Sequence, residues 1–286
     1  MKLSKMRIAV GLPKPLRLLH ISDTHLCYAD ERDDVRKREL AAQRRPCFEG
    51  PEEGRCLRNL DEAIRYAGEN CDLLLHTGDL IDFVSCRNLE LARDKLALVP
   101  NFVAAGNHEF SQYVGETFED AAYKMRSMPQ VQPAFGNDLH FAVRRLGGVR
   151  LIAVDNSYYH FDAGQLERLK AEVADGEPIL LLLHVPLHTP ELHRKSVEFH
   201  PDRCAYLAGT PEEALATYSP ERQRQQRPTP ETTEFIEYVR NCPAVRAILA
   251  GHIHFTENDA GAFSPYAMQY VAGGGYYNCA EEFELI

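Results

Sequence analysis

The 286-residue chain lacks three features that identify whole classes of protein. No apolar run approaches the roughly eighteen residues of a membrane-spanning helix, and the N-terminal region has no apolar core of an export signal. None of the eight cysteines forms a C-x-x-C pair with another. Basic residues are not in excess, because 42 Asp and Glu outnumber 32 Lys and Arg and give a net charge of −10.

These absences narrow the possible functions. Without a membrane span or export signal, the cysteines are expected to be reduced thiols of a soluble, cytoplasmic protein with no membrane partner. The acidic balance argues against a nucleic-acid partner. It still permits a small phosphorylated substrate, because bound metal ions would make a site locally positive. The absence of repeats and low-complexity linkers favours a single domain over residues 1–286, and the oligomeric state stays open.

Strand-like and helix-like segments alternate along the chain, which favours an α/β fold. Apolar, strand-like runs lie at 17–22, 72–77, 101–105, 179–183 and 245–250, and the C-terminal region contains two more. The spacing of apolar residues predicts helices within 57–67, 89–99 and 163–176, the last ending at Gly176. Two alternating runs joined at Gly147 and Gly148 predict a hairpin over 140–156.

Two segments interrupt this alternation. Residues 27–55 are charged and largely without periodicity, and residues 193–231 combine prolines, a basic run and scattered aromatics. Both are candidate insertions over a site, although solvated loops are the plainer interpretation. The basic residues at 32–45 alternate with acidic ones, which indicates a solvated face rather than a phosphate clamp.

Polar residues with metal-binding side chains follow the five apolar runs. They are Asp23, His25, Asp79, Asn107, His184, His252 and His254. Strand ends in an α/β fold open onto one edge, so these residues can converge there. Their nitrogen and oxygen donors suit Mn, Fe or Zn ions. Seven ligands exceed one tetrahedral site and favour two metals that share a bridging carboxylate.

The local spacing supports this hypothesis unevenly. If strand geometry continued, residues two apart, such as Asp23 and His25, would point the same way and grip one ion. Gly78 permits a tight turn before Asp79, whose carboxylate can bridge two cations. His184 alone is equally well explained as a core histidine. The prediction therefore depends on all five motifs occurring together in one chain.

D-x-H, G-D, G-N-H-[DE], H and G-H-x-H, in this order over residues 17–255, resemble the calcineurin-like metallophosphoesterase superfamily. The resemblance implies a four-layer αββα sandwich with a binuclear metal site at the strand ends. It also implies the ligand sets: Asp23, His25 and His254 for the first metal, Asn107, His184 and His252 for the second, and Asp79 as the bridge.

The same resemblance implies a mechanism and a role for two further residues. A hydroxide bridging the metals would attack phosphorus in line, and His108 would protonate the leaving group. Asp82 matches the position of a carboxylate that orients this histidine, although it could instead cap a helix.

Several other polar residues near the motifs favour plainer roles. Glu109, His20 and His76 favour structural hydrogen bonding over metal binding. His188 and His193 are expected on a loop over the site, where surface positions are favoured over substrate contact.

Departures from the patterns of subfamilies narrow the function. G-D-L-I-D lacks the arginine-glycine continuation of the protein serine/threonine phosphatases, and no tyrosine follows Gly78-Asp79 as in the purple acid phosphatases. D-T-H-L with G-H-x-H is similar to phosphodiesterase-like bacterial members. The leading hypothesis is a metal-dependent phosphohydrolase that cleaves a small phosphomonoester or phosphodiester. A DNA-processing nuclease subunit conflicts with the acidic balance, and a non-catalytic metal-binding scaffold conflicts with the complete ligand set.

Overall fold

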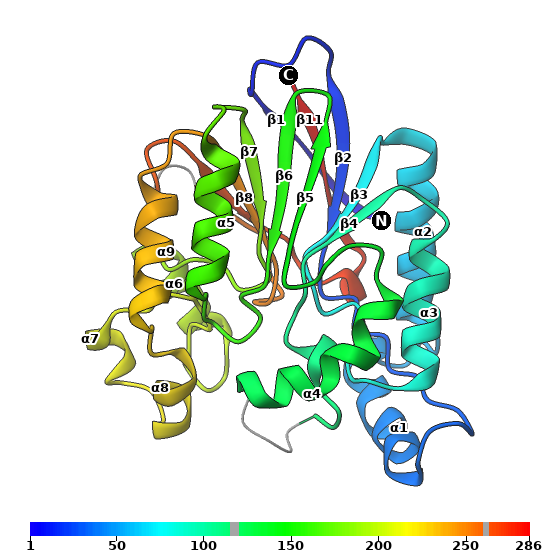
Figure 1. Ribbon diagram of the computed structural model, residues 1–286. Helices are drawn as coiled ribbons and strands as arrows, with labels where there is room; N and C mark the ends of the chain where they lie inside the picture. Colours follow the sequence, from blue (N-terminus) through cyan, green and yellow to red (C-terminus); the bar gives the residue numbers. More distant parts are fainter. Residues whose placement is uncertain (115–119, 260–262) are drawn as a thin grey trace.

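Two β-sheets and the helices flanking them make up the molecule (Figure 1). A computed structural model describes residues 1–114, 120–259 and 263–286. The first sheet has the strand order β1-β11-β2-β3-β4, and the second has the order β5-β6-β7-β8-β10-β9. None of the described helices is long and apolar enough to cross a membrane.

The strands that lead to the predicted ligands are parallel to one another within each sheet. The first sheet contains β1 (Lys2–Ile8), β2 (Leu16–Ile21), β3 (Leu73–His76), β4 (Asn101–Val103) and β11 (Cys279–Leu285), with β2, β3 and β4 parallel. The second contains β5 (Phe141–Leu146), β6 (Val149–Val154), β7 (Ile179–Leu182), β8 (Val245–Ala250), β9 (Glu257–Asp259) and β10 (Met268–Val271), with β6, β7, β8 and β10 parallel. Parallel strands deliver their carboxyl ends to one edge.

Successive residues of the inner strands belong to different cores. In β7, Ile179 and Leu181 pack under the outer helices, whereas Leu180 and Leu182 pack between the two sheets. Strands buried on both faces need apolar side chains at every position, which explains the continuous apolar runs in the sequence. The inter-sheet cluster also takes Leu18 from β2 of the first sheet, so the sheets pack face to face.

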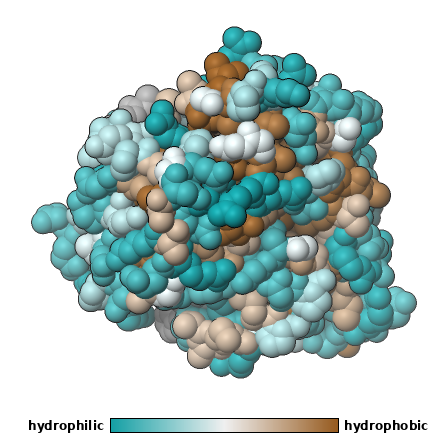
Figure 2. Space-filling view, turned by 45° about the horizontal axis from the view of Figure 1, so that its top comes forward, coloured by the Kyte–Doolittle hydropathy of each residue, from teal (hydrophilic) through white to brown (hydrophobic). Residues whose placement is uncertain are grey.

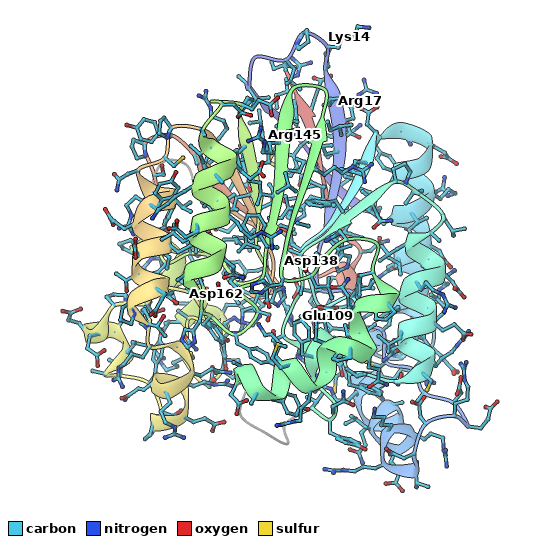
Figure 3. All side chains as sticks on the ribbon, viewed as in Figure 1. Lys14, Arg17, Glu109, Asp138, Arg145 and Asp162 are labelled. Carbon is cyan, nitrogen blue, oxygen red and sulfur yellow. The ribbon has the colours of Figure 1, made fainter. Side chains whose placement is uncertain are left out.

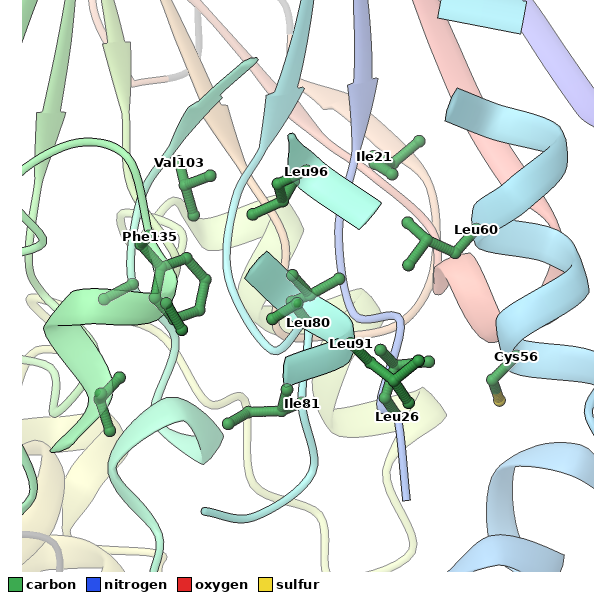
Figure 4. Packing of buried hydrophobic residues seen from close by; sticks show 14 of the residues in the cluster. Ile21, Leu26, Cys56, Leu60, Leu80, Ile81, Leu91, Leu96, Val103 and Phe135 are labelled. Carbon is green, nitrogen blue, oxygen red and sulfur yellow. The ribbon is translucent and has the colours of Figure 1, made fainter. Parts of the chain in front are cut away.

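Helices close the two outer layers. α2 (Arg55–Asn70) and α3 (Cys86–Leu96) cover the first sheet, and Figure 4 shows Leu60 and Leu91 among the apolar side chains of that layer. α5 (Ala163–Val173) and α9 (Pro230–Arg240) cover the second sheet, where Phe161 and Phe235 stack with ring centroids 3.9 Å apart. Two sheets between two helical layers confirm the predicted α/β sandwich.

Both segments expected as loops contain helices, so the loop interpretation is wrong there. Residues 27–55 include α1 (Val35–Glu49), and residues 193–231 include most of α6 (Pro190–Phe199) together with α7 (Glu212–Leu215), α8 (Pro220–Gln226) and the start of α9. α1 has no apolar stripe. It is instead fixed by an N-cap at Asp34 and by a few buried side chains such as Ala41 and Phe48. Without apolar periodicity it gave no helical signal.

The remaining elements are short or lie at the edges. They are α4 (Ala121–Val131) and the 3₁₀ turns η1 (His108–Phe110), η2 (Gln132–Ala134) and η3 (Gly275–Tyr277). The helix expected to reach Gly176 ends at Val173. Figure 3 places Glu109 near the carboxyl ends of the strands, at the opposite end of the molecule from Lys14 and Arg145. Figure 2 turns the end with Lys14 and Arg145 toward the viewer and shows apolar side chains exposed among mostly hydrophilic ones.

Candidate metal centre

All seven predicted ligands meet beyond the strand ends, between the two sheets. Asp23, His25, Asp79 and His254 offer ligand atoms within 4.8 Å of one another, and so do Asp79, His184 and His252. The seventh, Asn107, places its Oδ1 3.2 Å from His184 Nε2. The convergence expected from the sequence is therefore present.

Asp79 is the residue common to both groups. Its Oδ2 lies 3.7 Å from His25 Nε2 on one side and 3.3 Å from His184 Nε2 on the other. Its Oδ1 accepts a hydrogen bond from the backbone N–H of His108 at 2.9 Å, which restrains the carboxylate. One oxygen thus faces both groups of ligands.

Each of the four imidazoles uses one nitrogen for orientation and turns the other toward the cluster. The outward nitrogens contact the Thr77 carbonyl (His184, 2.7 Å), Asp82 (His25, 3.1 Å), Tyr159 (His252, 2.9 Å) and Tyr276 (His254, 3.1 Å). Such outer partners orient metal-binding histidines in proteins. The inward nitrogens of His184 and His252 are only 3.0 Å apart. Convergent imidazole nitrogens and carboxylate oxygens form a donor set that fits divalent cations.

Most of the ligands stand in an unusual backbone conformation. Asp23, His25, Asp79, His252 and His254 have φ angles of 53°, 50°, 55°, 72° and 63°. Residues other than glycine adopt this left-handed region at a cost of about 1–3 kcal/mol each. The ligands two apart therefore converge through left-handed turns, and the idea that strand geometry continues through them is wrong. Hydrogen bonds from Asp23 N–H to the Gly78 carbonyl and from His25 N–H to the Asp79 carbonyl, both 2.9 Å, hold the first turn.

Two glycines allow the loops after β3 and β4 to touch. Gly78 has φ 95°, and a Cβ there would lie 2.5 Å from the backbone nitrogen of Gly106. A Cβ on Gly106 would lie 2.3 Å from Asp79 Oδ1. Neither position can accept a side chain, and the φ of Gly78 agrees with the tight turn expected there from the sequence.

Comparison with known proteins places this geometry in a family. Residues 16–255 match the family model described as calcineurin-like phosphoesterase. The chain belongs to this family. With the two ligand groups, membership indicates a binuclear site for divalent metal ions.

Solved structures support the fold of this phosphoesterase. A dimetal phosphatase from Danio rerio shares 16% identity at a TM-score of 0.55, with 91% of this chain and 88% of that chain covered. A purple acid phosphatase from yellow lupin (Lupinus luteus) shares 14% identity at a TM-score of 0.52. That match covers 92% of this chain and 44% of the lupin chain, so the phosphoesterase spans less than half of it. No curated protein matches the chain.

The predicted pair of His108 and Asp82 is in contact. His108 Nδ1 lies 2.7 Å from the Asp82 carbonyl oxygen and 3.1 Å from Asp82 Oδ1. Asp82 does not cap a helix, since the N-cap of α3 is Ser85, whose side chain accepts from the Asn88 N–H. The structure therefore contradicts the capping alternative.

Opposite charges in the centre shift the pKa of Asp79 and that of His108 in opposite directions. Burial acts to raise the pKa of Asp79, but the charges of His184 and His108 lower it well below its ordinary value. Burial acts to lower the pKa of His108, whereas the carboxylates of Asp79 and Asp82 raise it to about 10. Ionised carboxylates give the site the negative charge that attracts divalent cations.

Arg44 of α1 was not predicted as a site residue. Its Nε and Nη2 donate to Asp82 Oδ2 at 2.7 Å and Oδ1 at 2.9 Å. One turn later, the ring of Phe48 stacks on His25 at 4.1 Å and 8°. The prediction of a solvated face for residues 32–45 is wrong for Arg44. No local pattern could reveal this contact, because it spans 38 residues.

The other polar residues near the motifs have contacts within the protein. Glu109 accepts from the backbone N–H groups of Asp79, Leu80, Ile81 and Gly106, and burial with the charge of Asp79 raises its pKa to about 7. His20 contacts Thr77 and Glu281, and His76 contacts Thr24. These contacts agree with the structural roles expected for them.

His188 and His193 lie away from the site. Their rings contact each other at 5.2 Å, and neither is among the described residues that line the cavity next to the ligands. His193 belongs to α6, so its expected position on a loop is wrong.

A cavity of about 1010 Å³ opens directly onto the ligand cluster. Asp79, Asn107, His108, His252 and His254 line its inner end. Another part of its wall comes from the segment around α6 and α8 and includes His200, Pro201, Asp202, Tyr206, Glu221, Arg222, Arg224 and Gln225. Residues 193–231 thus border the site as one of the two expected insertions. No residue of 27–55 is among the described lining residues.

Proposed function

We propose that this phosphoesterase hydrolyses a small phosphomonoester or phosphodiester with two divalent metal ions of the Mn, Fe or Zn type. The observation that carries the proposal is Asp79 Oδ2, which faces His25 and His184 at once. The assignment follows the two ligand groups: Asp23, His25 and His254 for one ion, Asn107, His184 and His252 for the other, and Asp79 for both.

The chain supplies what the ions do not. When bound, two such ions activate a water nucleophile and neutralise negative charge on the phosphate. His108 lines the cavity, and its Nδ1 is held by Asp82, so its Nε2 is the nitrogen that can reach a substrate. In this position it donates a proton to the leaving oxygen as the ester bond breaks. Asp82 keeps the ring in the orientation that this transfer requires.

The size of the cavity bears on the substrate. A volume of about 1010 Å³ is at the upper end of small-molecule sites and far exceeds what a phosphate alone needs. The part of the wall around α8 presents the ring of Tyr206, which lies 6.1 Å from the His252 ring and has the Arg222 guanidinium 4.8 Å from its centroid. This wall favours a substrate whose phosphate reaches the ligand cluster while a sizeable organic group lies against α8.

A comparison of two esters tests the proposal. The metal-free protein, reloaded with Mn²⁺, Zn²⁺ or Fe²⁺, should hydrolyse p-nitrophenyl phosphate if it is a monoesterase and bis(p-nitrophenyl) phosphate if it is a diesterase. Chelated protein is the control and should be inactive. Binding of two metal equivalents without turnover of any phosphoester in a broad panel would contradict catalysis. Affinity for DNA that falls steeply with salt would instead favour a nuclease subunit.

A further inference from the structure

Helix α1 contacts two residues of the candidate metal centre. Arg44 and Phe48 lie one helical turn apart, so both side chains leave the same face of the helix. Arg44 reaches Asp82, Phe48 stacks on His25, and the guanidinium lies 5.1 Å from the Phe48 ring. Neither residue is among the described residues that line the cavity, so this face contacts the centre without meeting the substrate.

Asp82 is the point through which this face can act. Its side chain is fully buried, and its Oδ1 lies 3.1 Å from both His25 Nδ1 and His108 Nδ1. One carboxylate oxygen therefore contacts a proposed metal ligand and the proposed proton donor together, and the Asp82 carbonyl oxygen adds a second contact to His108 Nδ1 at 2.7 Å. The torsion about the last side-chain bond of an aspartate is broad, so contacts to both oxygens hold the carboxylate plane better than contacts to one oxygen.

Arg44 holds both oxygens. Its planar guanidinium gives one donor to each, which is the paired geometry that fixes a carboxylate plane and that a lysine cannot reproduce. Arg44 is not among the described residues that line the cavity, so direct binding of the substrate phosphate is not its role. Its side chain is 26% exposed, whereas that of Asp82 is 0% exposed.

We propose that Arg44 is a positioning residue, which fixes the Asp82 carboxylate so that His25 is set for metal binding and His108 for proton donation. Helix α1 thereby couples the two functions through one oxygen atom. This inference rests on the proposed phosphohydrolase activity for its kinetic consequence, but its consequence for metal binding does not.

Kinetics of the holoenzyme test the proton-donor half. Arg44→Met should lower kcat about 10–100-fold for phenyl phosphate, a poor leaving group, and less for p-nitrophenyl phosphate, with KM little changed. Arg45→Met is the matched control, because Arg45 is the next residue of α1 and contacts Glu53 and the Cys27 carbonyl instead. It should retain wild-type kcat. An Arg44→Met enzyme with the kinetics of Arg45→Met would overturn the proposal.

Metal titration of the apo protein tests the other half without any turnover. Arg44→Met should weaken one of the two metal equivalents about 10–100-fold and leave the other nearly unchanged, since only His25 contacts Asp82 among the ligands. Equal affinities in the variant and the wild type would contradict positioning. If the wild type binds two ions but cleaves no ester, the proposed activity fails and this titration still decides the role of Arg44.

Two further variants keep the proposal testable if Arg44→Met does not fold, and test whether Arg44 acts through Asp82. Arg44→Lys keeps the charge but cannot hold both oxygens, so it should give an intermediate loss of turnover and metal affinity. If Arg44→Met does not fold, wild-type behaviour of Arg44→Lys overturns the proposal. In an Asp82→Asn background, Arg44→Met should cost little more, because the residue through which it acts has already changed. Losses that multiply fully would show that Arg44 acts elsewhere.

Discussion

Glu109 lies directly behind Asp79, and its carboxylate accepts the Asp79 backbone N–H at 2.8 Å while the Asp79 side chain faces the proposed metals. The same carboxylate accepts the N–H groups of Leu80 and Gly106 at 2.7 and 2.6 Å. Glu109 thus gathers the donors of two loops whose backbones carry Asp79 and Asn107. It shapes the site without being a proposed ligand.

Replacing Glu109 with Gln should be costly for this reason. An amide group turns one acceptor into a donor that faces backbone N–H groups, which leaves buried donors unsatisfied at about 1–3 kcal/mol each. We expect Glu109→Gln to lower the free energy of unfolding by at least about 2 kcal/mol in urea denaturation. Glu53→Gln, on the exposed surface, is the control and should be neutral. A neutral Glu109→Gln would show that the loops do not need this carboxylate.

Asp79→Ala should remove activity and weaken both metals. It is the one residue common to both ligand groups, so neither ion keeps its full set. Asn107→Ala should lower the occupancy of only one ion, the one assigned to Asn107, His184 and His252. Metal content after dialysis distinguishes the two variants. Unchanged stoichiometry in Asp79→Ala would rule out the bridging assignment.

His108→Ala should leave both metals bound, because its imidazole belongs to neither of the two groups that share Asp79. Its loss should slow turnover most for esters with high-pKa leaving groups, by about 10²–10⁴-fold for a full general-acid contribution. Rates over a series of aryl phosphates measure this dependence. An equal loss for activated and unactivated esters would contradict proton donation by His108.

Lys124 and Asp155 should make stability depend on pH. The two charges lie 2.7 Å apart, and although burial acts to raise the pKa of Asp155, Lys124 lowers it. A lowered folded-state pKa stabilises the protein above the unfolded value of about 3.9, and this contribution is lost as the pH falls through the folded value. Lys124→Met removes the counter-charge and leaves the buried carboxylate only its hydrogen bonds from Ser157, at a cost of about 3 kcal/mol near pH 7.

Urea denaturation of Lys124→Met and the wild type at several pH values measures that loss. The difference in free energy of unfolding should shrink as the pH falls below about 4, where Asp155 of the variant is protonated and no longer needs a partner. Lys170 lies on the surface near Glu167 and Glu234, so the control variant Lys170→Met should show no such trend. A difference independent of pH would mean that packing, not charge, accounts for Lys124.

The parts of this fold that the sequence predicts are those decided by neighbouring residues. Leu180 to Leu182 form an uninterrupted apolar run because β7 is buried on both faces, and His184 follows where that run stops. The motifs at strand ends therefore located the proposed ligands, and their resemblance to a family supplied the pairing into two sets. That pairing depends on the packing of two sheets, which no local pattern contains.

The features that escaped prediction depend on distant partners. α1 lacks an apolar stripe, and Arg44 gains its position from Asp82 across 38 residues. The left-handed conformations of Asp23 and His254 contradict local preference and are held by neighbouring loops. Local propensity fails at these positions because tertiary contacts override it, and they lie at the site itself.

The proposed ligands are divided between the sheets, and this gives the ions a second role. Asp23 and His25 follow a strand of the first sheet and His254 follows one of the second, while Asn107 belongs to the first and His184 to the second. Each ion would then cross-link the two sheets, and its complete ligand set would form only after the sheets have packed together. A free metal concentration 100 times the dissociation constant would raise the free energy of unfolding by about 2.7 kcal/mol for one ion, because only the native state binds it. The melting temperature would report how much metal surrounds the protein.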